Sequence, residues 1–121
     1  MVEERADLQG DASCNCESPD ARYQQFRSWR ILPCDDTDGR FGDVSILECI
    51  DCRQLWLRYA VEYEGFSNSG RWARGKIEDA RARGIRSGEA VDFLAGLPSY
   101  LYGGSRFGKA GTGSGAMNWG T

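Results

Sequence analysis

The 121-residue chain has no histidine, and its only lysines are Lys76 and Lys109. Histidine is the side chain most often used for acid–base catalysis near neutral pH, so its absence argues against an enzyme. The acidic and polar N-terminus has no apolar run suited to a signal peptide, and no later stretch is long and apolar enough to span a bilayer. We therefore expect a non-enzymatic protein of a bacterial-type cytoplasm.

Four of the five cysteines form two tight pairs, Cys14-Asn15-Cys16 and Cys49-Ile50-Asp51-Cys52. The cytoplasm keeps thiols reduced, and an odd count leaves Cys34 over from any full disulfide scheme, so the pairs favour a metal. Two such pairs brought together supply four thiolates, the ligand set of a closed tetrahedral zinc site. Four protein ligands leave no position for water, and such a site is structural rather than catalytic.

The second cysteine pair lies between two predicted strands, Val44–Glu48 and Leu55–Glu64. Apolar and polar residues alternate with a period of two along the second of these, the clearest secondary-structure signal in the chain. The hairpin that they form would carry two thiolates in its turn. Residues 71–77 fit a third strand, and residues 30–33 could form a further short one.

One main helix is predicted after Ser87, a good N-cap with Glu89 in the first turn. Apolar residues follow at helical spacing, and Pro98 ends the helix. The expected fold is a small α+β domain with an antiparallel sheet of about three strands, a four-cysteine knuckle and one main packed helix. Residues 1–12 are expected to be disordered, 13–108 to form the single metal-stapled domain, and 109–121 to be a flexible Gly-rich tail.

From Cys14 to about Ile77 the pattern resembles the zinc-ribbon group of folds, in which thiolates from two knuckles grip one zinc ion. That group usually has Cys-x-x-Cys at both knuckles, whereas Cys14 and Cys16 are separated by one residue. Whether Cys34 replaces one of the paired thiols is therefore open. An iron site of rubredoxin type, with a redox role, and a cluster of small buried core cysteines are the alternatives to zinc.

The surface expected to bind a partner combines acids and aromatic residues. Acidic residues crowd one turn, where they would lie exposed and attract a basic partner: Asp35, Asp36 and Asp38. Trp56 and Trp72 would supply aromatic anchors, although strand aromatics more often pack in a core. A compact acidic zinc-ribbon-like protein is similar to small bacterial proteins that act as immunity proteins or inhibitors of partner toxins, so a protein partner is expected.

The alternative function is nucleic-acid binding. Arg71, Trp72, Arg74 and Lys76 interleave basic and aromatic side chains, which can suit single-stranded nucleic acid. The competing interpretation is a charged, solvated face of an edge strand, kept charged to prevent aggregation. The net charge of −3 favours this second interpretation over a nucleic-acid site.

Overall fold

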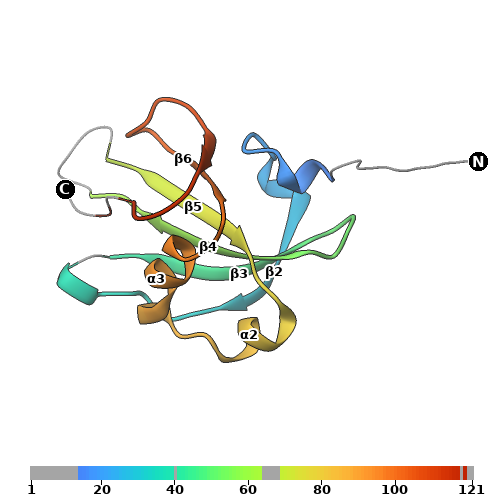
Figure 1. Cartoon of the computed structure of the whole chain (residues 1–121), viewed down its shortest axis with the longest axis horizontal. Helices are drawn as coiled ribbons and strands as arrows, with labels where there is room; N and C mark the ends of the chain where they lie inside the picture. The colour runs from blue at the N-terminus through green and yellow to red at the C-terminus, as the bar shows by residue number, and fades with distance from the viewer. Residues whose placement is uncertain (1–13, 40, 64–68, 118, 120–121) are drawn as a thin grey trace, which may run out of the picture.

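The computed structural model describes residues 14–39, 41–63, 69–117 and 119, which form one antiparallel sheet with short helices. The sheet has six strands whose order follows the chain, so each strand pairs with its sequence neighbours (Figure 1). The strands are β2 (Phe26–Ile31), β3 (Asp43–Cys49), β4 (Leu55–Val61), β5 (Arg71–Lys76), β6 (Tyr100–Gly103) and β7 (Gly111–Gly113). The α-helices are α2 (Asp79–Gly84) and α3 (Ala90–Ala95). The described residues also form four 3₁₀ turns: η1 (Asn15–Glu17), η2 (Tyr23–Gln25), η3 (Thr37–Gly39) and η4 (Ser87–Glu89).

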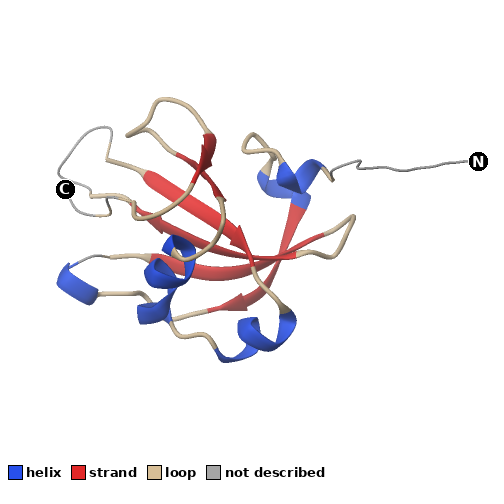
Figure 2. Cartoon of the chain, viewed as in Figure 1, coloured by secondary structure: helices blue, strands red, loops and turns tan. Residues whose placement is uncertain are grey.

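The expected three-stranded sheet with one main helix is wrong, although the fold remains broadly α+β. The three predicted strands are present as β3, β4 and β5, and Figure 2 shows the sheet with short helical segments around it rather than one main helix. The number of strands was underestimated for a local reason. The β2–β3 ladder shifts register between Ser28 and Arg30, which interrupts the alternation, and β6 and β7 contain glycines that read as turns. The predicted helix over Ser87 to Leu97 begins as η4, and α3 has six residues.

The two faces of the sheet differ because β4 alternates regularly. Leu57 and Tyr59 point into the main core, where Ile46, Ile85 and Leu94 are also buried. The α3 helix covers this face so closely that a Cβ on Gly75 would meet the Leu94 and Leu97 side chains. Trp56, Arg58 and Ala60 therefore lie on the opposite face, here called the open face.

The C-terminal segment differs from the expected flexible tail. Gly111–Gly113 pairs with β6 as strand β7, and the buried ring of Trp119 packs edge-on against Tyr59 with centroids 4.8 Å apart. The Tyr63 hydroxyl donates a 2.6 Å hydrogen bond to the Trp119 carbonyl. Glycine allows this packing, because a Cβ on Gly111 would lie 2.9 Å from the Tyr102 hydroxyl. The domain therefore continues beyond the expected boundary at 109, while the expectation for 1–12 concerns residues outside the described ranges.

Candidate functional site

The four paired cysteines meet at one end of the sheet. Cys14 and Cys16 flank the start of η1, Cys49 ends β3, and Cys52 lies in the turn before β4. Their sulfur atoms all lie within 4.8 Å of one another, and this cluster could hold a metal ion. The Sγ atoms of Cys14 and Cys49 are 3.6 Å apart, and those of Cys16 and Cys52 are 3.5 Å apart. These separations approach the edge of about 3.8 Å that a tetrahedron with zinc–sulfur bonds of about 2.3 Å requires, and are far longer than a disulfide bond of about 2.05 Å.

Hydrogen bonds hold the turn after β3 and the sulfur atom of Cys49 in place. The Asp51 backbone N–H and the Gln25 side-chain amide donate to Cys49 Sγ at 3.4 and 3.3 Å. The Arg53 N–H donates to the Cys49 carbonyl at 3.0 Å and closes the turn. Arg53 itself has a φ of 67°, in the left-handed region that non-glycine residues rarely occupy. The local backbone is thus bent to turn both sulfur atoms of this pair toward the N-terminal pair.

The thiols of the cluster have unequal proton affinities. Burial raises the pKa of Cys49, but hydrogen bonds from the Cys52 and Asp51 backbone and from Gln25 outweigh it and lower the pKa from 9.0 to about 6. Burial raises the pKa of Cys16, and the neighbouring thiols of Cys52 and Cys49 raise it further. Burial also raises the pKa of Cys52. One thiol therefore ionises readily, and a bound divalent cation would provide the charge needed to ionise the others.

Cys34 is not a member of the cluster. It is exposed, and the group of sulfur atoms found among the described residues contains only the two pairs. The four-ligand set predicted from the pairs is therefore the set that the structure brings together, without substitution by Cys34. Gln25 is the supporting residue that sequence reasoning missed, because an isolated glutamine ahead of β2 carries no recognisable signal.

Arg74 binds the loop that contains Cys14 and Cys16, here called the N-terminal cysteine loop, to the sheet. Its Nη2 donates to the carbonyls of Cys16 and Ser18 at 2.9 and 2.8 Å. Its guanidinium lies 4.8 Å from the centroid of Phe26 and 5.1 Å from that of Trp56, within cation–π range. Burial lowers the pKa of Arg74 to about 10, so the side chain remains charged at neutral pH.

The predicted basic face of an edge strand is therefore wrong. β5 is an interior strand between β4 and β6, and both Arg71 and Arg74 are buried. Arg71 points to the opposite face from Arg74, donates from Nε to the Ser69 carbonyl, and lies over the Tyr63 ring. Lys76 forms an ion pair with Glu17 at 3.2 Å. The four residues proposed as one nucleic-acid surface thus do not share a face.

Of the residues predicted to bind a partner, some are buried and some are exposed. Asp35 and Trp56 are each only 3% exposed, so neither offers a surface to a partner. Asp36 is exposed and Trp72 is half-buried. Asp38 lies in η3, and its side chain is outside the described part of the structure. Asp35 is buried because its side chain accepts hydrogen bonds within its own loop and from β4, which residue type alone does not indicate.

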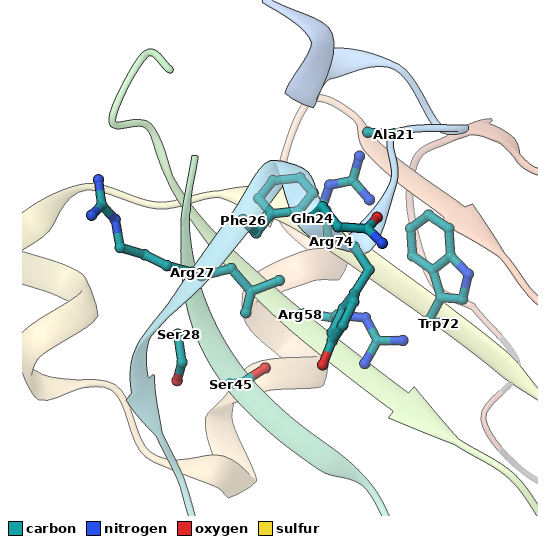
Figure 3. Close-up of a pocket in the computed structure, with 11 residues that line it drawn as sticks. Ala21, Gln24, Phe26, Arg27, Ser28, Ser45, Arg58, Trp72 and Arg74 are labelled. Carbon is teal, nitrogen blue, oxygen red and sulfur yellow. The ribbon is translucent and has the colours of Figure 1, made fainter. Parts of the chain in front are cut away.

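A groove of about 600 Å³ crosses the open face next to the cysteine cluster. Figure 3 shows Phe26, Arg58 and Trp72 around this groove, whereas Arg27 extends away from the others. The lining residues come from the N-terminal segment and strands β2 to β5: Ala21, Tyr23, Gln24, Phe26, Arg27, Ser28, Ser45, Leu47, Arg58, Trp72 and Arg74. We call it the open-face groove.

Comparison with known proteins gives no match: no family model, curated protein or solved structure matches the chain. The functional argument consequently rests on the geometry of the chain itself. Over the described ranges, no helix combines the length and apolar character needed to cross a lipid bilayer.

Proposed function

We propose that the protein holds one structural zinc ion through Cys14, Cys16, Cys49 and Cys52. The observation that carries this proposal is the convergence of four sulfur atoms within 4.8 Å from two segments about 35 residues apart. A tetrahedral set of four thiolates suits zinc or iron. We favour zinc because a closed four-cysteine set is its usual structural site. An iron protein of rubredoxin type is the alternative that the metal content decides.

The zinc ion would act as a staple. It would join the loop before β2 to the turn between β3 and β4, whose sulfur atoms already lie within 4.8 Å of one another. Four sulfur ligands leave no open position at which water or a substrate could be activated, and the chain contains no histidine. Both features support a non-catalytic role in which metal binding contributes directly to folding.

The protein would act by binding another molecule at the open face. The open-face groove supports this proposal. It lies beside the cysteine cluster, on the side of the sheet opposite α3. A binding module of this kind would suit an immunity protein or toxin inhibitor, the class suggested by the sequence. The acidic loop no longer supports that class, because Asp35 is buried and of its acids only Asp36 is seen to be exposed.

Elemental analysis of the reduced, purified protein tests the metal proposal. We expect one zinc ion per chain, and we expect Cys49→Ser to lose zinc and unfold, because removing one ligand removes metal-coupled folding energy. Cys34→Ser is the matched control and should keep both metal and fold, since Cys34 is exposed and lies outside the cluster. A folded, reduced protein without metal would overturn the proposal, and stoichiometric iron would replace zinc by the rubredoxin alternative.

A further inference from the structure

The open-face groove collects positive charge on a protein of net charge −3. Three arginines line it, and none of its lining residues is acidic. Arg27 is neutralised by an ion pair with Glu48 at 2.9 Å, and the Arg74 guanidinium is committed to the cysteine loop. Arg58 is the remaining cation, placed on β4 in the middle of the groove between Ser45 of β3 and Arg74 of β5.

Arg58 lacks a direct partner within the described ranges. No hydrogen bond or ion pair to it is found there, and the Asp43 charge is the one acidic influence on it. It lies directly across the ladder from Arg74, and like charges in that position repel each other. Burial lowers the pKa of Arg58, as expected for a cation held partly out of water. An anion in the groove would relieve this repulsion and supply the missing partner.

Three aromatic side chains line the same groove as this cation and differ in their exposure. The Tyr23 ring is 88% exposed at the rim, and Phe26 and Trp72 are half-buried. The Trp72 ring packs against Gly103 of β6, where a Cβ would be 2.7 Å from the ring, and the Arg74 guanidinium lies 5.2 Å from the ring centroid. The exposed Tyr23 ring is accessible to a ligand, and aromatic faces beside an arginine can form a stacking surface for nucleobases.

We propose that the open-face groove binds single-stranded nucleic acid, with a phosphate at Arg58 and bases stacked on Tyr23 and Trp72. This inference rests on the proposed role as a binding module and names its ligand class. An acidic peptide would satisfy Arg58 but would leave the aromatic faces unused. A duplex would leave them unused as well, because its bases are already stacked. The surface differs from the one expected from sequence, since it uses Arg58 and Tyr23 and excludes Arg71 and Lys76.

The test measures fluorescence anisotropy of labelled single-stranded DNA and RNA oligonucleotides of mixed sequence, titrated with the zinc-loaded full chain at low salt. We expect micromolar binding that weakens with added salt. Tyr23→Ala and Arg58→Gln should each weaken binding at least fivefold, and Arg58→Gln should reduce the salt slope of log K by about 0.7, the value for one phosphate contact on a single strand. The controls are Phe41→Ala, another exposed aromatic residue, and Arg86→Gln, an exposed arginine near α3; both should bind as wild type.

Several outcomes would overturn the inference. These are no oligonucleotide binding, binding insensitive to the Tyr23 and Arg58 variants, or tighter binding of a glutamate-rich peptide that depends on Arg58 alone. Metal content and circular dichroism are measured on the same samples. Zinc-loaded, folded protein that fails to bind oligonucleotide overturns the ligand class and leaves the metal proposal standing, whereas a folded, metal-free protein that still binds overturns only the metal proposal.

Discussion

The hydroxyl of Tyr59 donates a 2.5 Å hydrogen bond to Oδ2 of Asp35, and both residues are buried. This contact joins the middle of β4 to the loop between β2 and β3. Thr37 secures the other carboxyl oxygen of Asp35, donating from its hydroxyl at 2.6 Å. The hydroxyl of Tyr59 fits only because Gly42 has no side chain, since a Cβ there would lie 2.2 Å from it. The loop is therefore part of the core's polar framework.

Replacing Tyr59 by phenylalanine should destabilise the protein by about 1–3 kcal/mol, because Asp35 loses a donor inside the protein where water cannot easily replace it. The measurement is urea unfolding of the metal-loaded protein, followed by tryptophan fluorescence. Tyr23→Phe is the matched control, since its ring is 88% exposed, and it should unfold at the wild-type midpoint. Equal midpoints for the two variants would show that the Asp35 contact contributes nothing.

Trp119→Ala should destabilise the protein by about 3 kcal/mol or more, the usual cost of truncating a buried tryptophan. The residue is 4% exposed and packs against Tyr59, so the cavity would open in the main core. Thermal unfolding by circular dichroism measures the effect. Thr112→Ala in β7 serves as the control because the Thr112 side chain is exposed. An unchanged melting temperature for Trp119→Ala would restore the view of a dispensable tail.

Arg53→Gly should stabilise the metal-loaded protein by roughly 0.5–1 kcal/mol. The left-handed φ of 67° costs a non-glycine residue about 1–2 kcal/mol, part of which glycine's greater freedom in the unfolded chain cancels. Arg53→Ala separates the backbone effect from loss of the side chain, because alanine keeps the strain. If both variants gain the same stability, the effect comes from removing the arginine side chain and not from the backbone.

Arg74→Lys should loosen the N-terminal cysteine loop. Lysine keeps the charge but cannot reproduce the planar guanidinium that bonds the Cys16 and Ser18 carbonyls while lying between aromatic rings. We expect faster zinc transfer to a colorimetric chelator than in the wild type, at an unchanged zinc content. Arg86→Lys, an exposed substitution of the same kind, should transfer zinc at the wild-type rate. A variant rate equal to that of wild type would show that metal retention does not depend on this tether.

The cysteine cluster and the central strands are the parts that the sequence predicts well. Cysteine pairing is a chemical signal that needs no knowledge of the fold, and the alternation from Leu55 to Val61 reports a strand with one core face. The spacing of Cys14 and Cys16 left the set of ligands open between them and Cys34. That choice depends on where the loop before β2 runs, and Arg74 of a distant strand fixes its course.

The surface residues are where sequence reasoning fails. Asp35 and Arg74 are charged side chains that single-sequence rules assign to solvent, yet both are buried because specific partners bind them. Residues 111–113 have linker composition but form a strand, because Gly111 and Gly113 let the backbone lie against tyrosine rings. In each case the deciding partner is at least nine residues away, beyond the range of local pattern.

The meander order of the sheet has a consequence for synthesis on the ribosome. Each hairpin can pair as soon as its second strand has emerged, and all four clustered cysteines are available once residue 52 has been made. Trp119, which packs on Tyr59, follows every strand of the sheet in the chain. The four cysteines of a nascent chain can therefore come together well before Trp119 is available to complete the main core. In that interval the cysteine knuckle would be fixed while the Tyr59 face stayed open to solvent and to chaperones.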